Sequence, residues 1–488
     1  MNFKTRETWN NVAGNQTAHP LRQYEPENIA QIIDIIKEAE KHNLPVRAIG
    51  SSHSWSDVGV TTGFLVKPDK LDKVMALDAA LLKDQVDKST LFQVESGLTI
   101  RKLNEELDAK GLALINMGGY DAQTIAGVIS TSTHGSGIEF GPLSDFVESL
   151  EIVSDGGLVY RIEPTNGITK PAEYKSKYPQ RKLIQDDDWF NAVVVSMGCM
   201  GVIYSVILRV TKKYWLKEKR EVATWDQIKE DLKKGDVLKN HRHYEVLVNP
   251  HKVDGQHRCL ITTRNITTSV KNSLFDDRTN RNFIELLLPV ASEVAKLLLN
   301  IAPNQAGKLI NDGLKALVDK AYINVSYKVF NIGVANEIPA LSAEIGFPLK
   351  GHTYIAAVDK FLEVVEQHES LGGLYHSAPI SLRFVKASEK FLSMMHGCDT
   401  CMMEIIMAKE TRGAVEMMHR YENELYRFSG RPHWGQINSL TGSHDLVKSM
   451  YPKYNKWLDI YKKLNKNGTF DSPFSKRVGF RKESFVST

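Results

Sequence analysis

Hydrophobic and polar residues alternate at two different periods along the first 210 residues, and the two periods predict helices and strands in turn. Apolar residues at helical spacing predict a helix over 26–41, which begins with a proline, and another over 99–110. Strands are expected at 44–49 and at 90–95, where TLFQVE alternates between apolar and polar residues.

A hairpin is expected in the middle of this half of the chain. Residues 149–153 and 157–162 are rich in branched apolar side chains, and Ser154-Asp155-Gly156 lies between them as a turn. Helices and short strands are thus interleaved. The pattern predicts an α+β fold with two small clusters of strands rather than one doubly wound sheet.

The pattern changes near residue 210, where the chain becomes lysine-rich, as in TKKYWLKEKREVATW. Strand patterns such as 243–248 and 258–263 then mix with helical patterns such as 411–426, which indicates a second α+β domain. The tail is rich in Tyr, Asn, Gly and Pro and has too little hydrophobic pattern for a domain, so we expect it to pack back on one. The predicted divisions are 1–212, 213–440 and 441–488.

Composition limits the classes of function. A chain of 488 residues is too long for one compact core, and 42% hydrophobic with 25% charged residues is ordinary globular composition. The net charge of +4 gives no reason to expect a nucleic acid or an anionic membrane as partner. The oligomeric state is left open.

Neither the first residues nor the most apolar segment predicts a membrane association. MNFKTRETWNNVAGN has no apolar core typical of a secretory signal. The segment 283–302 contains Glu285, Pro289, Glu293 and Lys296, so an amphipathic core helix is expected rather than a membrane span. These features favour a cytoplasmic protein.

Cysteines and histidines give little support for a metal or a disulfide framework. The chain has four cysteines, of which Cys398 and Cys401 form a C-x-x-C motif, but no second pair completes a zinc site. We expect two ordinary thiols near the start of a strand. His241 and His243 form an H-x-H without a nearby third ligand, so no metal site is predicted.

Three turns of small residues stand out: 50–54 (GSSHS), 130–137 (STSTHGSG) and 198–201 (GCMG). Successive backbone N–H groups in such turns form concave nests that bind anions, and hydroxyls add donors. Each turn alone is better explained as a surface loop, and His53 and His134 alone are better explained as structural histidines. Together, the turns suit a long pyrophosphate ligand.

The combination of these segments resembles one family over nearly the whole chain. GSSHSW, GGYDAQTIAGVISTSTHGSG, MGCMGVIYSVILRV, RPHWGQ and GTFDSPFSKR are similar to segments of FAD-dependent oxidases of the vanillyl-alcohol oxidase (p-cresol methylhydroxylase) type, in the sugar-lactone and alditol oxidase branch. The resemblance implies a two-subdomain FAD-binding domain of α+β class and an α+β substrate domain that caps it.

The resemblance also implies which residues contact FAD. In this branch a histidine of the first turn is commonly bonded to the flavin 8α-methyl, and His53 has that place, with Ser52 where a glycine is usual. Serine fits only if its backbone angles allow it. The implied cofactor contacts are Arg47, Gly50, Ser51, Ser52, His53, Ser54, Gly118, Thr124, Gly127, Ser130, Thr133, His134, Gly135, Gly201 and Ile203.

Two charged residues typical of the branch are replaced by neutral ones. Lactone and alditol oxidases typically place a Glu-x-Arg on a cap-domain strand and a lysine after His-Trp-Gly. Here Arg383 has the arginine place, whereas Ser381 and Gln436 stand at the glutamate and lysine places. We therefore expect a substrate of different geometry, such as a bulkier sugar, an oligosaccharide or a nucleoside-like alcohol.

The proton acceptor that alcohol oxidation needs must then lie elsewhere. Glu404 in the apolar strand CMMEIIM is one candidate, and the alternative is that it pairs with a buried basic residue such as Arg383. Glu245 and His433 are further candidates.

The expected activity is oxidation of an alcohol group of a sugar-like, polyol, lactone or nucleoside-like small molecule by FAD. Gly118, implied to lie near flavin C4a, leaves room for O2, which favours an oxidase that produces hydrogen peroxide. Two alternatives stay open: a dehydrogenase that uses another electron acceptor, and a flavin-binding protein without turnover.

Overall fold

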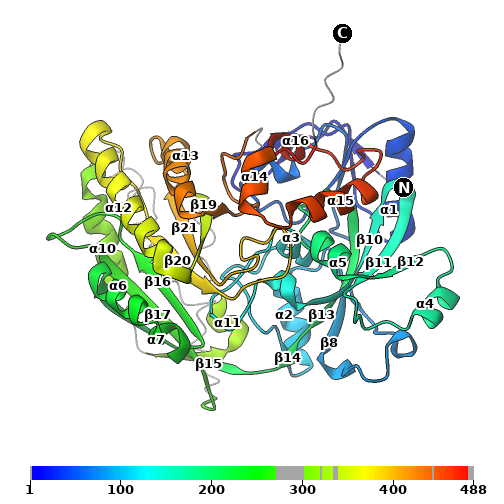
Figure 1. Cartoon of the computed structure of the whole chain (residues 1–488), viewed down its shortest axis with the longest axis horizontal. Helices are drawn as coiled ribbons and strands as arrows, with labels where there is room; N and C mark the ends of the chain where they lie inside the picture. Colours follow the sequence, from blue (N-terminus) through cyan, green and yellow to red (C-terminus); the bar gives the residue numbers. More distant parts are fainter. Residues whose placement is uncertain (1–2, 271–301, 319–320, 333–338, 442–443, 482–488) are drawn as a thin grey trace, which may run out of the picture.

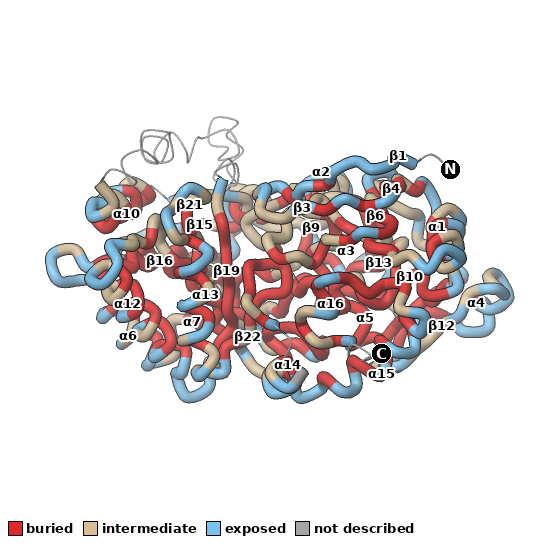
Figure 2. Tube along the Cα trace, turned by 90° about the horizontal axis from the view of Figure 1, so that it is seen from above, coloured by how far each residue is buried: buried red, intermediate tan, exposed pale blue. Residues whose placement is uncertain are grey.

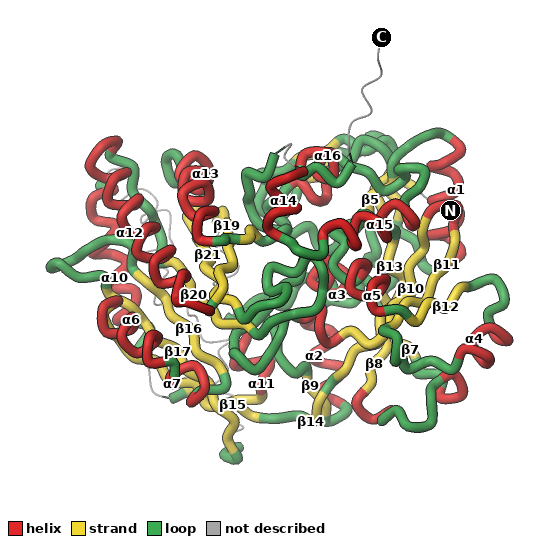
Figure 3. The backbone as a smooth tube through the Cα atoms, viewed as in Figure 1, coloured by secondary structure: helices red, strands yellow, loops and turns green. Residues whose placement is uncertain are grey.

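The computed structural model describes residues 3–270, 302–318, 321–332, 339–441 and 444–481. These residues form two lobes that lie side by side (Figure 1). The N-terminal lobe contains two sheets with strands from residues 3–209, and the cap lobe contains one eight-stranded sheet with strands from residues 215–432. Helices and strands are interleaved in both lobes (Figure 3), which confirms the α+β class.

The first sheet of the N-terminal lobe has the order β1-β4-β6-β5. Its strands are β1 (Phe3–Thr5), β4 (Arg22–Tyr24), β6 (Phe64–Val66) and β5 (Val46–Ala48). Helix α1 (Ile29–Lys41) buries Ile32, Ile35 and Ile36 against it. The helix begins three residues later than the sequence pattern predicts, because Asn28, not Pro26, caps it by accepting the Gln31 N–H at 3.0 Å.

The second sheet has six strands in the order β12-β11-β10-β13-β8-β7. They are β12 (Lys182–Gln185), β11 (Leu158–Glu163), β10 (Val147–Ser154), β13 (Val202–Arg209), β8 (Leu91–Glu95) and β7 (Val74–Met75). The predicted hairpin is confirmed as the antiparallel pair β10–β11. Helices of this lobe are α2 (Ile100–Ala109), α3 (Ile125–Ser130), α4 (Pro171–Lys177) and α5 (Asp187–Val193).

Two short strand pairs complete this region. Strands β2 (Trp9–Asn10) and β3 (Thr17–Ala18) pair near the chain start, and β9 (Leu112–Ala113) pairs with β14 (Thr211–Lys212) at the passage into the cap lobe.

The cap sheet is antiparallel, in the order β18-β15-β17-β16-β20-β21-β19-β22. The strands are β15 (Trp215–Thr224), β16 (His243–Val248), β17 (Arg258–Thr267), β18 (Tyr322–Val325), β19 (Ala340–Pro348), β20 (Ile380–Val385), β21 (Thr400–Ala408) and β22 (Arg431–Pro432).

Helices cover the two faces of the cap sheet unequally. Helices α6 (Trp225–Lys234), α7 (Asp236–Asn240), α12 (Thr353–Gly372) and α13 (Ala414–Leu425) lie on one face, where they bury the largest apolar cluster of this lobe. Helix α10 (Ala306–Ala316) lies on the other side of the sheet (Figure 2), and α11 (Ser326–Phe330) follows β18. Among the described residues, fewer helices therefore cover the second face than the first.

The C-terminal segment returns to the N-terminal lobe (Figure 1). Its helices are α14 (His444–Met450), α15 (Tyr454–Leu464) and α16 (Pro473–Arg477). Trp457 of α15 is fully buried and its Nε1 donates to the Val195 carbonyl at 3.1 Å. The tail thus contributes to the core of the first lobe.

Other expectations have simpler outcomes. Cys398 and Cys401 are free thiols beside the start of β21. No helix in the described ranges is both long and apolar enough to span a membrane. The helix expected over 283–302 lies, except for its last residue, outside the described residues.

Candidate active site

A cavity of about 940 Å³ lies between the lobes and is lined by residues of both. Nearly all residues selected from the sequence line it. They are Arg47, Gly50, Ser51, Ser52, His53, Ser54, Gly118, Thr124, Gly127, Ser130, Thr133, His134, Gly201, Ile203, Ser381, Arg383, Glu404, His433 and Gln436. Segments up to 389 residues apart, from Arg47 to Gln436, therefore meet at one place.

Gly135 differs from this set because it does not line the cavity. A Cβ at this position would stand 2.4 Å from the Met117 carbonyl oxygen and 2.6 Å from Asn116 Oδ1. Gly135 therefore lets two loops pack closely, and its contact with the cofactor stays a prediction.

The turn at 50–54 forms a cradle of free donors. Among the described residues, the backbone N–H groups of Gly50 to Ser54 have no hydrogen-bond acceptor. A Cβ on Gly50 would stand 2.3 Å from Thr124 Oγ1, so glycine lets this turn meet the N-terminus of α3. Successive unpaired N–H groups that face a cavity are the donor set of an anion nest.

Ser52 adopts a backbone conformation that favours glycine, the residue that is usual at this position in the family. Its φ is 61°, in the left-handed region that favours glycine. The side chain gains a contact that glycine lacks, because Ser52 Oγ accepts a hydrogen bond from Trp9 Nε1 at 3.0 Å. This bond offsets part of the cost of the left-handed backbone.

The side chain of Arg47 stabilises the turns through hydrogen bonds to backbone carbonyls. Its side chain is 1% exposed and donates to the carbonyls of Val58 and Met197, and Nη1 lies 3.7 Å from Cys199 Sγ. Arg47 thus joins the strand before the first turn to the turn around Gly198 and Gly201. Arg47 also lines the cavity, and its contact with the cofactor stays a prediction.

His53 projects a neutral imidazole into the cavity. Nε2 lies 2.9 Å from the Tyr120 hydroxyl, and Nδ1 has no hydrogen-bond partner among the described residues. Burial lowers the pKa of His53 to about 4, so the ring is unprotonated at neutral pH. An unprotonated ring nitrogen with a free lone pair is the nucleophilic form of histidine.

The cap sheet contributes a row of charged side chains to the opposite wall. Arg264 Nη1 lies 2.7 Å from Glu245 Oε1, and Arg383 Nη2 lies 3.1 Å from Glu404 Oε2. Glu245 and Arg383 are direct partners on β16 and β20. Positive and negative charges alternate along Arg264, Glu245, Arg383 and Glu404, so each of these buried charges lies next to an opposite one.

The glutamate missing at position 381 is replaced from the neighbouring strand. Ser381 is the register partner of Glu404, and the Glu404 carboxylate contacts Arg383. The acidic group therefore occupies nearly the same region of the wall from β21 instead of β20. In this position Glu404 can be both a partner of Arg383 and a proton acceptor, so the two alternatives are compatible.

The two candidate bases Glu404 and Glu245 differ in pKa because their surroundings differ. Burial and the nearby Glu344 raise the pKa of Glu404, although Arg383 partly opposes them. Burial also opposes ionisation of Glu245, but Arg264 and Arg383 hold its pKa at about 2. Glu404 is therefore the stronger proton acceptor of the two.

His433 acts as a donor rather than as the base that the sequence suggested. Burial lowers its pKa to about 4, so the ring is neutral. Nδ1 accepts the Gly435 N–H at 3.1 Å, which places the ring proton on Nε2. A nitrogen that already carries the proton cannot take another from a substrate hydroxyl.

Glu344 is a site residue that the sequence reading missed. It lies on β19 opposite Glu404, lines the cavity and contacts His134 Nε2 at 3.1 Å through Oε1. Burial opposes ionisation of Glu344, but the contact with His134 and the nearby Arg383 lower its pKa. The signal in the sequence was a lone glutamate in the apolar run ALSAEIGFP, the same signal that identified Glu404.

His134 links the two lobes through Nε2. Nδ1 lies 2.9 Å from the Gly135 carbonyl oxygen, and Nε2 contacts Glu344. The ring also lines the cavity, and its contact with the flavin stays a prediction.

The residues present fit an FAD molecule. Besides the nest at 50–54, two buried polar atoms of the lining, Ser96 Oγ and Gln436 Oε1, lack a hydrogen-bond partner among the described residues. Buried polar atoms without partners are uncommon in folded proteins unless a ligand or water completes them. The nest suits a pyrophosphate, and the orphaned atoms suit the polar edges of a flavin or its substrate.

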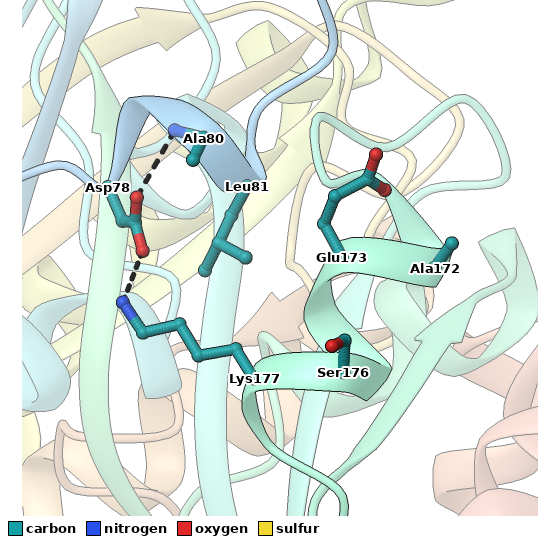
Figure 4. A pocket seen from close by; sticks show the side chains of 7 residues that line it. All are labelled: Asp78, Ala80, Leu81, Ala172, Glu173, Ser176 and Lys177. Carbon is teal, nitrogen blue, oxygen red and sulfur yellow. Dashed lines mark hydrogen bonds and ion pairs between the residues drawn. The ribbon is translucent and has the colours of Figure 1, made fainter.

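A second hollow lies on the surface of the N-terminal lobe, between residues 78–81 and α4 (Figure 4). Two of its charged groups pair with each other: Asp78 contacts Lys177 and accepts the Ala80 N–H at 3.1 Å. Helix α4 lies on the side of the molecule away from the cap lobe (Figure 1). The cavity between the lobes is therefore the candidate active site.

Comparisons of the sequence with known proteins agree with this site. A family model described as D-arabinono-1,4-lactone oxidase matches residues 206–478, and one described as FAD binding domain matches residues 20–163. The chain is 26% identical to L-gulonolactone oxidase of Mus musculus over 468 residues, which cover 94% of this chain and 95% of the relative.

Two further relatives differ in acceptor and in coverage. L-gulono-1,4-lactone dehydrogenase of Mycobacterium tuberculosis is 26% identical over 472 residues, covering 96% of this chain and 98% of the relative. D-arabinono-1,4-lactone oxidase of Saccharomyces cerevisiae is 28% identical over 297 residues, covering 60% of this chain and 51% of the relative.

Solved structures share the fold at low sequence identity. A solvent-stable cholesterol oxidase aligns with a TM-score of 0.75 at 13% identity and covers 97% of both chains. A chitooligosaccharide oxidase aligns with a TM-score of 0.62 at 10% identity, covering 95% of this chain and 93% of its own. These two likenesses concern the fold.

The resemblance inferred from GSSHSW and STSTHGSG is thereby confirmed, with FAD as the cofactor. With an FAD cradle on one lobe, an Arg–Glu pair on the other and a family match over 56% of its length, the chain belongs to the D-arabinono-1,4-lactone oxidase family of FAD-dependent oxidoreductases.

Proposed function

We propose that this protein oxidises a CH–OH group of a sugar-lactone-like substrate to a carbonyl and transfers the two electrons to O2, which yields hydrogen peroxide. The observation that carries the proposal is the Glu404 carboxylate, held against Arg383 with a raised pKa and facing the FAD cradle across one cavity. The names of the relatives support a lactone as the substrate class.

Bound FAD supplies the redox chemistry, because its flavin accepts a hydride from carbon and gives up two electrons to oxygen. Glu404 takes the proton of the substrate hydroxyl, and its raised pKa makes it a better base than an ordinary glutamate. Arg383 holds the Glu404 carboxylate and donates to the substrate oxygen. Ser381 and Gln436 offer hydroxyl and amide groups to neighbouring substrate oxygens.

A covalent bond from His53 to the flavin 8α-methyl is part of the proposal. The neutral ring with a free Nδ1 supports it, and the Tyr120 hydroxyl fixes the ring from the opposite nitrogen. The bond replaces one methyl hydrogen, and O2 accepts the two electrons released. Such a bond retains the cofactor and makes the flavin a stronger oxidant.

Oxygen as the acceptor is part of the proposal because Gly118 carries no side chain that could obstruct the cavity at this point. This glycine lines the cavity, and a Cβ there would contact the His134 carbonyl oxygen at 3.2 Å. The dehydrogenase relative favours a second candidate function, in which the electrons go to another acceptor.

One experiment separates the candidates. The holoenzyme is mixed anaerobically with a panel of lactones, polyols, sugars and nucleosides, and the flavin absorbance is followed. Bleaching by a lactone followed by rapid peroxide formation in air is the expected result. Bleaching without reaction with air would favour the dehydrogenase, and no bleaching by any compound would favour a flavin-binding protein without turnover.

A further inference from the structure

One row of residues across the cap sheet changes from acidic to aliphatic. The register of five neighbouring strand pairs places its members side by side, all on the same face of the sheet. In order from β19 to β15, the row is Glu344, Glu404, Ser381, Leu247, Leu260 and Val222. The change falls between Ser381 and Leu247, which are direct register partners on β20 and β16.

Helix α10 closes over the aliphatic half of this row. Leu260, Ile310, Leu314 and Leu317 form one apolar cluster, and Leu247 packs against it. All five side chains also line the cavity. We call these five residues the apolar arm.

The apolar arm and the reactive carboxylate belong to one continuous cavity. Leu247 is only half-buried, so part of its side chain faces open space beside Ser381. From Ser381 to Leu260 the row crosses two strand spacings, which gives the arm a length of about 10 Å. Ile406 on β21 and Pro379, which directly precedes β20, also line the cavity and extend the apolar surface.

A fully hydroxylated sugar does not match such a wall. Hydroxyl groups placed against aliphatic side chains lose their water without gaining a partner, which costs free energy for each group. An apolar substituent gains free energy at the same place, because it removes its own surface and that of the leucines from water.

We propose that the natural substrate is amphipathic: its hydroxyl-bearing head lies against Arg383 and Glu404, and an alkyl or ring substituent occupies the apolar arm. The inference rests on the proposed function for the position of the head. It names the substrate class more narrowly than a free sugar lactone, and it replaces the oligosaccharide and nucleoside-like alcohols suggested by Ser381 and Gln436.

The test measures binding separately from turnover. Holoenzyme carrying Glu404→Gln is titrated with D-arabinono-1,4-lactone and with its 5-O-methyl, 5-O-propyl and 5-O-hexyl ethers, and the flavin difference spectrum gives each Kd. We expect Kd to fall about fourfold for each added methylene until the arm is full. In the double variant with Leu247→Trp, which fills the arm, the methyl and hexyl ethers should bind equally.

A matched leucine outside the cavity serves as the control. Leu371 on α12 is 81% exposed, so Leu371→Trp should keep the dependence of Kd on chain length. Two results would overturn the proposal that the apolar arm binds a substituent of the substrate. One is equal Kd values for the methyl and hexyl ethers in the Glu404→Gln protein, and the other is a chain-length dependence that persists in the Leu247→Trp variant.

The failure of this inference is distinguishable from failure of the proposed function. If the parent lactone reduces the wild-type flavin but longer ethers bind no tighter, the proposed function is supported and the role of the apolar arm is refuted. If longer ethers bind tighter but no alcohol in the panel reduces the flavin, the binding role of the apolar arm is supported and the proposed function is refuted.

Discussion

At the scale of single residues, the site depends on how burial and neighbouring charges set each side chain's protonation. His53 and His433 are neutral because they are buried, whereas Glu245 stays ionised beside two arginines. Glu404 differs from these groups because another carboxylate, Glu344, stands opposite it. Only Glu404 among these candidate bases combines a raised pKa with a position on the reactive wall.

Replacing the proposed base should slow the first half of the reaction. Glu404→Gln removes the proton acceptor but keeps the shape, so we expect flavin reduction to fall about 100-fold or more in anaerobic rapid mixing. In the wild type, the rate should rise with pH through a pKa above that of an ordinary glutamate, since the ionised form is required. The variant should lose this rise.

A surface glutamate provides the comparison. Glu410 lies just after β21 and is exposed, so Glu410→Gln should leave both the rate and its pH dependence unchanged. A Glu404→Gln protein with near wild-type reduction would show that the base lies elsewhere.

His53→Ala should release the cofactor from its covalent bond. After acid precipitation, the wild-type pellet should be yellow and the variant pellet colourless, because the bond to the flavin depends on the imidazole. A colourless wild-type pellet would contradict the attachment. Tyr120→Phe removes the hydroxyl that fixes Nε2, and we expect slower attachment on adding FAD to the apoprotein.

At the scale of elements, short loops between strands and helices build the cofactor wall. Arg47 fastens two of them from behind, and Gly50 and Gly135 allow them to pack closely. The loop that carries Gly118 packs against His134 and lines the cavity.

Gly118→Ala should separate the two half-reactions. The added methyl group comes within 3.2 Å of the His134 carbonyl, a contact that a shift of a few tenths of an ångström relieves. We expect reoxidation of the flavin by O2 to slow at least tenfold and its reduction by substrate to change little. Stopped-flow measurement of both steps checks this, and an equal loss in both would argue against an oxygen path at this glycine.

Sequence periodicity located most elements of the first lobe but not their caps. The hairpin β10–β11 and helix α2 follow their patterns closely, because apolar residues on one face must be buried. The start of α1 was displaced from Pro26 to Ile29, because the side-chain hydrogen bond of Asn28 decides the cap.

At the scale of the whole molecule, the tail is part of the core of the first lobe. Trp457 is fully buried and stacks on Tyr461, with ring centroids 5.5 Å apart. Its environment includes residues from the middle and the end of the chain, among them Val195 and Phe480. The lobe that holds the cofactor therefore depends on residues beyond position 450.

Trp457→Ala should destabilise the protein strongly. Removal of a large buried side chain leaves a cavity, and we expect a loss of about 3–5 kcal/mol in the free energy of unfolding. Denaturant unfolding followed by flavin fluorescence measures it. The neighbouring Lys456 pairs with Asp188 on the surface, and Lys456→Ala should cost less than about 1 kcal/mol; similar losses in both variants would contradict the core role.

Several sequence predictions stay predictions: the peroxide product, the covalent flavin, the cytoplasmic location and the division at 212 and 440. They concern chemistry, surroundings or boundaries that neither the fold nor the family match decides.

The sequence by itself determined the α+β class, the small-residue turns and the family, since these follow from local periodicity and from short contiguous motifs. It also indicated Arg383 and Glu404 as an unusual arginine and an unusual glutamate in apolar strands. Only the tertiary structure decided that these two side chains meet, that Glu344 stands opposite them and that leucines continue the same row. The reason is physical: strand register and the packing of α10 bring together residues far apart in the chain, and no local pattern encodes that neighbourhood.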